Sequence, residues 1–425
     1  MTHEIAAGWR RARLGDHVEL VAGFAFRSSE FSTSEVDVRL LRGDNVGQGH
    51  LRWAGVKRWP VERSPEVQRY RLEIDDVVLA MDRPWIEAGL KYARVREHDL
   101  PCFLVQRVAR LRAGDGVITQ EFLPYLIGSP QFTQHVLSVQ TGTAVPHISG
   151  AQILSYMLSV PPRGEQAAIV NILAALDDKI ESNRRLALLL DEAAATLFRA
   201  RFVDYLGDTD LIESVMGRIP REWSTGYLGD IACESKTSTR PFDRPDALFE
   251  HFSIPAFDAG ARPEVVRGEE IRSAKTKLPE EPNLLLSKLN PATKRVWRPT
   301  PRGQGEPVCS PEFIVLVPLD ETPLSYLDGL LMADTAFYGR LLGYATGTTG
   351  SRQRVKSGDV LGIPLVIPPT AERLAFGEIA SPLLAHADRL RNESCTLSDL
   401  RDALLPKLVS GQMRVPDAED LVAAN

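Results

Sequence analysis

Polar and cationic side chains gather in one short segment, Lys288–Arg295, directly after the apolar run 284–286. An asparagine such as Asn290 can pair with the edge of adenine, and the planar fork of an arginine fits guanine. A lysine offers a point charge that suits phosphate. This chemistry is typical of a nucleic-acid reader. We therefore assign Arg295 to a base contact and Lys294 to a phosphate contact, and we expect Lys288 to contact DNA as well. The alternative is a cationic turn exposed to solvent.

Further candidates for nucleic-acid contact lie in both halves of the chain. Arg83 is followed by Pro84 and comes after a strand-like run, which places it at a loop tip, where functional residues often lie. Cations after a Thr-Gly-Thr sequence could hold phosphates. For each candidate the alternative is a solvated surface residue. The full set outside the first segment is Arg27, Arg83, Lys91, Gln106, Thr141, His147, Arg352, Arg354 and Lys356.

The motifs of catalysis are missing from the sequence. It contains no GxxxxGK[ST] loop for ATP and no FxGxG. Asn290-Pro291-Ala292-Thr293 comes nearest to the Asn-Pro-Pro-aromatic motif of amino-methyltransferases, but it lacks the second proline and the ring. The 8 histidines are scattered, and the 4 cysteines form no CxxC pair. The sequence therefore favours a binding protein over an enzyme, and we expect no catalytic residue, metal site or cofactor in this chain.

Composition indicates a globular chain of two or three domains. The 425 residues are 44% hydrophobic, and no apolar run is long enough to cross a bilayer, so we expect no membrane contact. The four cysteines lie far apart, which fits a reducing compartment, so we expect a cytoplasmic location. The formal net charge is −6. Residues 161–222 (8 Lys+Arg, 11 Asp+Glu) and residues 370–425 (6 and 9) each contribute −3. The two remaining long segments are near neutral, and each has room for a basic face.

An internal duplication organises the chain. Trp9-x4-Leu14-Gly15-Asp16 recurs as Trp223-x4-Leu228-Gly229-Asp230, and Pro161-Pro162 recurs as Pro368-Pro369. Because the landmarks keep their order, we predict two copies of one unit. Each copy begins with short β-rich runs broken by Gly, Pro and Asp, followed by a helical pattern near 119–138 or near 323–343. The fold class predicted is α+β, with two mostly-β globular domains.

A long helix is predicted to follow each double proline, because apolar residues recur there at steps of three and four. Each helix would leave an apolar stripe in water unless it found a partner, and the other helix is always close by. We therefore expect an antiparallel intramolecular coiled coil within a pseudo-two-fold internal repeat. The second helix has a weak point at Pro382 and is expected to end near Pro406. The predicted contact residues are Ile169, Ile172, Leu176, Ile180, Leu190, Leu197, Ile379, Leu383, Leu390, Leu397 and Leu404.

These features together resemble the specificity subunit of type I restriction–modification systems. Residues 160–170 (VPPRGEQAAIV) resemble the start of the family's first conserved helix, residues 405–415 (LPKLVSGQMRV) its C-terminal signature, and residues 75–79 (DDVVL) a common strand start. In the second copy Arg373 takes the place of Gln166. The resemblance covers roughly residues 9–415.

The resemblance implies a non-catalytic DNA-recognition subunit that reads a bipartite target in double-stranded DNA. It implies target-recognition domains at 1–160 and 216–369, spacer helices at 161–215 and 370–415, and a polar tail at 416–425. The implied partners are two modification (methyltransferase) subunits and a restriction (translocase and nuclease) subunit, which would hold S-adenosylmethionine, ATP and Mg²⁺. Two alternatives stay open, a coiled-coil scaffold without DNA binding and a DNA-modifying enzyme whose motifs are not recognisable.

Overall fold

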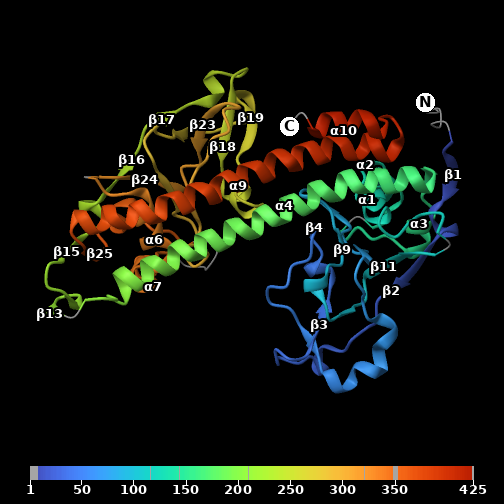
Figure 1. The fold of residues 1–425 in the computed structure, drawn as a ribbon, viewed down its shortest axis with the longest axis horizontal. Coiled ribbons are helices and arrows are strands. Elements are labelled where there is room, and N and C mark those ends of the chain that lie inside the picture. The colour runs from blue at the N-terminus through green and yellow to red at the C-terminus, as the bar shows by residue number, and fades with distance from the viewer. Residues whose placement is uncertain are drawn as a thin grey trace. The chain divides into compact units, whose positions relative to one another are not determined.

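Two compact units make up the chain. The computed structural model describes residues 8–114, 116–142, 144–208, 210–319, 321–347 and 353–423. Unit 1 combines the chain up to Asp178 with the part that begins at Leu397, and unit 2 is Lys179–Thr396. Each of the two long helices, α4 (Arg163–Phe198) and α9 (Thr370–Ser410), therefore contributes one part to each unit (Figure 1).

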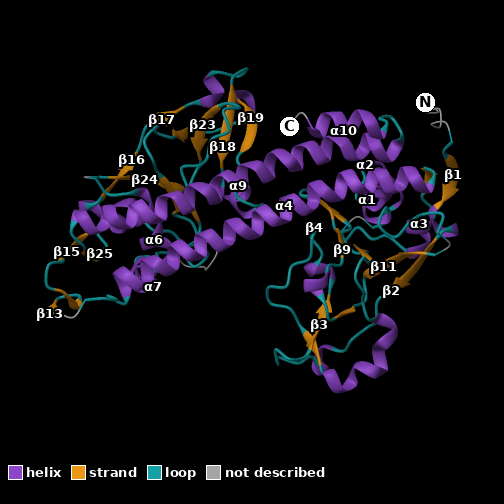
Figure 2. Ribbon diagram, viewed as in Figure 1, coloured by secondary structure: helices purple, strands orange, loops and turns teal. Residues whose placement is uncertain are grey.

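Unit 1 is built on short strands, in agreement with the prediction of a mostly-β domain (Figure 2). Its largest sheet has the order β2-β11-β6-β9-β4, and a three-stranded sheet has the order β10-β3-β5. The run 77–80 (VVLA) is completely buried, which explains why it forms a central strand, β6. The strands are β1 Arg10–Arg13, β2 Val18–Ala22, β3 Val38–Leu41, β4 Gln48–Gly49, β5 Arg58–Trp59, β6 Val77–Ala80, β7 Trp85–Ile86, β8 Gly89–Leu90, β9 Tyr92–Arg94, β10 Cys102–Leu104, β11 Val108–Ala113 and β12 Met157–Val160.

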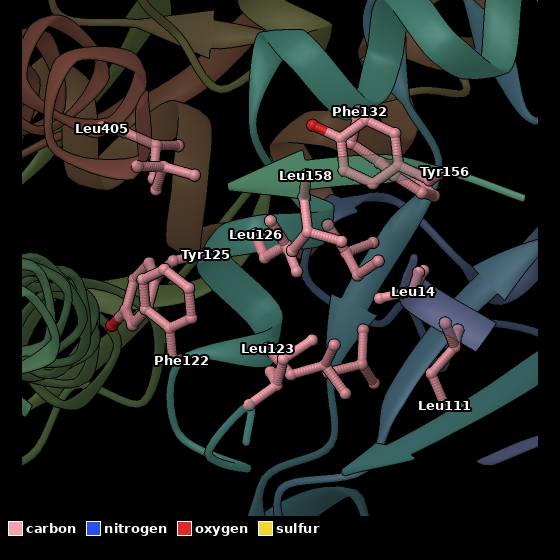
Figure 3. Packing of buried hydrophobic residues seen from close by; sticks show 14 of the residues in the cluster. Leu14, Leu111, Phe122, Leu123, Tyr125, Leu126, Phe132, Tyr156, Leu158 and Leu405 are labelled. Carbon is pink, nitrogen blue, oxygen red and sulfur yellow. The ribbon is translucent and has the colours of Figure 1, made fainter. Parts of the chain in front are cut away.

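Three short helices cover the sheet of unit 1, namely α1 (Leu123–Ile127), α2 (Pro130–Val139) and α3 (Gly150–Leu154). The helical pattern predicted near 119–138 is thus two helices, because Ser129 caps α2 by accepting a hydrogen bond from the Phe132 backbone N–H at 3.2 Å. Figure 3 shows part of the hydrophobic core of unit 1, to which helices and strands both contribute and to which Leu405 of α9 belongs.

Unit 2 repeats the plan with different sheet sizes. A four-stranded sheet has the order β16-β24-β21-β22, and a five-stranded sheet has the order β17-β20-β23-β18-β19. Its helices besides α4 and α9 are α5 Ile254–Asp258, α6 Leu324–Ala333, α7 Thr335–Gly343 and α8 Ser357–Leu361. Its strands are β13 Leu211–Ser214, β14 Gly217–Pro220, β15 Ser224–Tyr227, β16 Ala232–Ser235, β17 Ser238–Thr239, β18 Leu248–Phe252, β19 Glu264–Arg267, β20 Lys275–Lys277, β21 Leu284–Ser287, β22 Val296–Trp297, β23 Glu306–Cys309, β24 Phe313–Pro318 and β25 Pro364–Ile367.

The duplicated sequence landmarks have the same structural role in both units. The indole of Trp9 donates a hydrogen bond to Glu165 at 3.0 Å, and the indole of Trp223 donates one to Glu372 at 3.1 Å. Both carboxylates lie in the first turn of a long helix, where a negative charge is favoured. The predicted repeat is therefore a repeat of the fold as well.

The two long helices pack antiparallel within each unit, as predicted. In unit 1, Ile172 and Leu176 of α4 share a core with Leu404 of α9. In unit 2, Ala187 packs with Ala387 and Leu390, and Phe198 packs with Phe376 and Leu384. Along α4 from its N-terminus to its C-terminus, the contacting residues of α9 run from its C-terminal part towards its N-terminus, so the two helices are antiparallel.

The predicted contact residues are partly wrong near the end of α4 and the start of α9. Leu197 is 40% exposed and Ile379 is 59% exposed. The buried positions are Ala194 and Phe198 on α4, and Ala380 and Leu384 on α9. An α-helix repeats every 3.6 residues, so a stripe assigned with a period of 3.5 drifts off the buried face along a long helix. Other predicted contacts are buried or partly buried, namely Ile169, Ile172, Leu176, Ile180, Leu190, Leu383, Leu390, Leu397 and Leu404.

The C-terminal part of the chain differs from the prediction. Helix α9 continues through Pro382 and past Pro406 to Ser410. The polar tail predicted at 416–425 is for the most part a helix, α10 (Val415–Ala423), in which Ala418 is fully buried in the core of unit 1. Three well-spaced apolar side chains (Val415, Ala418 and Val422) were enough to bury one face of this short helix despite its charges. The first helix ends before residue 215, in a π-helical turn at Arg199–Val203.

An arginine fastens the β part of unit 2 to both long helices. The guanidinium of Arg298, just after β22, lies 2.7 Å from Asp191 of α4, 3.0 Å from Asp388 of α9 and 2.9 Å from Asp328 of α6. Arg391 of α9 also pairs with Asp388 and Asp191. Burial opposes the charge of Arg298, but the carboxylates of Asp328, Asp388 and Asp191 together raise its pKa. Burial raises the pKa of Asp328 even with Arg298 beside it.

Replacing Arg298 with methionine is expected to destabilise unit 2 by about 3–5 kcal/mol, because the surrounding carboxylates lose the cation that offsets their burial. The free energy of unfolding in urea measures this effect. Arg218→Ala is the matched control, because Arg218 and Glu213 are 4.0 Å apart and both well exposed, so their pair should contribute under about 1 kcal/mol. Equal losses in the two variants would contradict a fastening role for Arg298.

Candidate nucleic-acid interface

Three loops of unit 1 meet at one edge of its large sheet. Strand β11 is antiparallel to both β2 and β6, so the start of β11 lies beside the ends of the other two. Phe24, after β2, bridges Val105, before β11, and accepts a hydrogen bond from the Gln106 backbone N–H at 2.8 Å. Arg27, Arg83 and Gln106, which are far apart in the sequence, are therefore placed on neighbouring loops, and all three are exposed.

The segment 141–148 is fastened to the same edge. Backbone hydrogen bonds join Thr141 and His147 in both directions, at 2.8 and 2.7 Å. The imidazole Nδ1 of His147 lies 2.7 Å from Asp82, and Nε of Arg107 is 3.6 Å from the same carboxylate. His147 is half-buried and holds the loop against the end of β6, whereas Thr141 is exposed. The geometry gives His147 a positioning role.

Charged groups of both signs lie around Lys91, beside this edge. Burial lowers the pKa of Lys91, and Asp44 and Asp82 oppose this effect. The nearby cations Arg52 and Arg83 lower the pKa of Lys91 further. Since burial is what mainly disfavours the charged form of Lys91, an anion bound beside it would favour that form. A phosphate is such an anion, so this edge is suited to a nucleic-acid backbone.

The corresponding edge of unit 2 carries the other candidates, but several of them are already engaged. Lys288 donates to the Pro311 carbonyl at 3.1 Å and lies 3.6 Å from Glu234. Arg354 pairs with Glu312 at 3.0 Å. Asn290 holds the turn through its backbone, and Lys356, before α8, is exposed. Arg352 lies outside the described residues.

Lys294 and Arg295 point to partners within the protein. The ammonium of Lys294 lies over the ring of Tyr338 at 4.2 Å and donates to the Met332 carbonyl at 3.2 Å, while burial lowers its pKa. Arg295 donates to both carboxylate oxygens of Asp258, at 2.7 and 2.8 Å, and this hydrogen bonding raises its pKa. The base contact assigned to Arg295 stays a prediction, and it requires this ion pair to open.

Sequence reasoning missed several charged neighbours of the site. Arg107 follows Gln106 directly, and Lys236 follows β16 (Ala232–Ser235), so proximity to a strand end could have found both. Asp258 and Glu312, the ion-pair partners of Arg295 and Arg354, could not be predicted because no pattern in the sequence links them to these arginines. Within the described residues, no cluster of three or more His, Cys, Asp or Glu side chains is suited to a metal ion, and no helix has the length and apolarity to cross a membrane.

Residues 7–190 match the family described as type I restriction modification DNA specificity domain. The match covers less than half of the chain and says what residues 7–190 are similar to. The matched segment includes the whole sheet edge of unit 1 and the first part of α4. The resemblance identified from residues 160–170 and 75–79 is thereby confirmed for this specificity domain.

Relatives and one solved structure extend the likeness. The chain is 33% identical to the specificity subunit of the type I restriction enzyme EcoAI from Escherichia coli over 195 residues, which are 45% of this chain and 32% of that subunit. It thus spans about a third of that relative's length. It is 25% identical to the MjaIX specificity subunit of Methanocaldococcus jannaschii over 71% of each chain. The crystal structure of the type I restriction–modification S subunit from M. genitalium matches 96% of this chain and 98% of its own, with a TM-score of 0.56 and 12% identity, which supports the fold.

Replacing Lys356 with alanine is expected to weaken DNA binding on all sequences alike, because a lost phosphate contact carries no base information. The slope of log affinity against log salt concentration should fall by about one. Titrations of fluorescent duplexes at several salt concentrations measure both quantities. Lys407→Ala, at an exposed lysine of α9, is the control and should leave both unchanged. An unchanged salt slope for Lys356→Ala would remove this residue from the interface.

Proposed function

We propose that this chain is a sequence-specific DNA-binding specificity subunit that reads a bipartite target. The observation that carries the proposal is the duplicated sheet edge, at which each unit presents polar and cationic loops on a rigid frame. One reader in each unit would give two half-sites. The relatives named as type I specificity subunits support the same function.

The proposal extends to the assembly in which the chain would act. We infer that it binds double-stranded DNA and positions two modification (methyltransferase) subunits and a restriction subunit. S-adenosylmethionine, ATP and Mg²⁺ would belong to those partners and none of them to this chain. The cytoplasm is the compartment in which such a complex would meet DNA.

Binding to DNA separates the proposal from a scaffold that does not bind DNA. The full chain should bind a random-sequence duplex with an affinity that falls steeply as salt rises, since cations on the reader displace counterions from phosphates. Selection from a randomised duplex pool should then give two short conserved sequences separated by a fixed gap. No salt-dependent binding at all would favour the scaffold.

The purified chain is expected to transfer no methyl group by itself. Incubation with labelled S-adenosylmethionine and DNA that contains the selected target should leave the DNA unlabelled, and addition of a modification subunit should restore labelling. The physical reason is that the sequence has neither an FxGxG motif nor an Asn-Pro-Pro-aromatic motif. Methyl transfer by the pure chain would instead support the DNA-modifying enzyme.

Exchange of residues 223–369 for the matching region of a relative should change one half-site and leave the other as it was. The exchanged region contains the whole reader edge of unit 2, and the edge of unit 1 stays untouched. Pool selection with wild-type and exchanged chains gives the comparison. A change in both half-sites would show that the units do not read independently.

A further inference from the structure

Arg83 and Asn290 occupy the same structural position in the two units. Each lies three residues after a central strand, β6 or β21, and each is followed by a proline. The backbone φ is +45° at Arg83 and +46° at Asn290. Positive φ is uncommon for a residue other than glycine, and a residue held there often marks a functional constraint.

Matching hydrogen bonds fix this backbone position. The N–H of Arg83 donates to the Pro146 carbonyl at 2.7 Å, and the N–H of Asn290 donates to the Gln353 carbonyl at 2.8 Å. The residue that precedes each one also forms a bridge, so that Asp82 pairs with His147 in unit 1.

The same bridge joins Leu289 to Arg354 in unit 2. One residue further from the turn, the backbone pairing continues in both units. The Ile148 N–H donates to the Met81 carbonyl at 2.9 Å, and the Val355 N–H donates to the Lys288 carbonyl at 3.0 Å. Each turn is therefore held by the corresponding segment of its own unit, residues 146–148 in unit 1 and residues 353–355 in unit 2. We call this arrangement the backbone clamp. It sets where the side chain begins for any residue that can adopt this positive φ.

The two clamped side chains differ in chemistry. Arg83 is exposed, and among the described residues its guanidinium has no ion-pair or hydrogen-bond partner. The amide of Asn290 donates one hydrogen bond to Thr293 at 3.2 Å, which orients the amide plane. A rigid backbone with a free or oriented polar end is preorganised, so less entropy is lost on binding.

We infer that the clamped residue is a specificity-determining position in each unit, at which Arg83 reads guanine and Asn290 reads adenine. The inference rests on the proposed function, because it assumes that both units read DNA. Arginine pairs with O6 and N7 of guanine through two donors, and asparagine pairs with N6 and N7 of adenine through one acceptor and one donor.

A phosphate contact explains the pair of residues less well. Phosphate oxygens only accept hydrogen bonds, so they would use the arginine but leave the acceptor of the asparagine without a role. A shared phosphate site would also favour a cation in both units. An uncharged amide in one clamp and a guanidinium in the other fits two different base edges.

Exchanging the two side chains tests the inference on the full-length chain. Asn290→Arg should shift one base of the second half-site from adenine to guanine, with a preference of roughly 10- to 100-fold, and leave the first half-site unchanged. Arg83→Asn should shift one base of the first half-site from guanine to adenine. Pool selection followed by affinities for single-base variants measures both shifts.

Two further variants keep the test sharp. Arg83→Lys keeps the charge but replaces the planar fork with a single ammonium, so it should weaken the preference for guanine and keep the salt slope. Arg11→Asn, at an exposed arginine of β1, is the matched control and should change neither half-site. Thermal unfolding identifies any variant that fails to fold.

The outcomes separate the inference from the function on which it rests. A wild-type chain that selects a bipartite target, with variants that select the same bases but bind all duplexes more weakly, would overturn the inference and leave the function standing. A wild-type chain that selects no sequence would overturn both. Movement of one base in the matching half-site only, in each exchange, would support the inference.

Discussion

The apolar stripes of α4 and α9 are the constraint on which the rest of the structure depends. Neither helix can bury its stripe alone, so within each unit a segment of one helix must lie against a segment of the other. The antiparallel direction then follows from the chain order of helix, β-rich region and helix. Because Leu404 and Leu405 complete the core of unit 1, the C-terminal part of the chain is needed for the fold of the N-terminal part.

Polar fasteners on this helix pair connect it to the β-rich parts. Trp9 and Trp223 each donate to a carboxylate in the first turn of a long helix, so both copies dock in the same way. Arg298 adds a buried contact that reaches both helices within unit 2. Buried charges are costly unless they are paired. Such an ion pair therefore adds little net stability, but it tolerates only a narrow range of geometries. The β-rich part of each unit is therefore fixed to its own helix segments by specific polar contacts.

Much of the fold could be predicted from the sequence, and the site only in part. Ordered landmarks such as Trp9 and Trp223 revealed the duplication, and the steps of three and four revealed the helices. The buried face was assigned only in part, because Ala380 carries little hydrophobic signal beside Ile379, and Phe198 rather than Leu197 follows Ala194 on the buried face. Strand ends predicted Arg83 and Asn290 as loop residues. The ion pair between Arg295 and Asp258 could not be predicted from the sequence, since it joins the turn before β22 to the end of α5, 37 residues earlier in the chain.

The clamp around Arg83 and Asn290 indicates how one frame could serve different targets. Its hydrogen bonds run from backbone to backbone, so they do not depend on which side chain the turn carries. A substitution at the turn changes the chemistry presented at the edge and leaves the core untouched. Side chains also differ at another pair of corresponding positions. In unit 1 Leu20 lies beside Gly150, whereas in unit 2 the corresponding Glu234 accepts a hydrogen bond from Ser357 at 2.7 Å. Conserved backbone geometry with exchangeable side chains is what a reader needs if its specificity is to change without loss of stability.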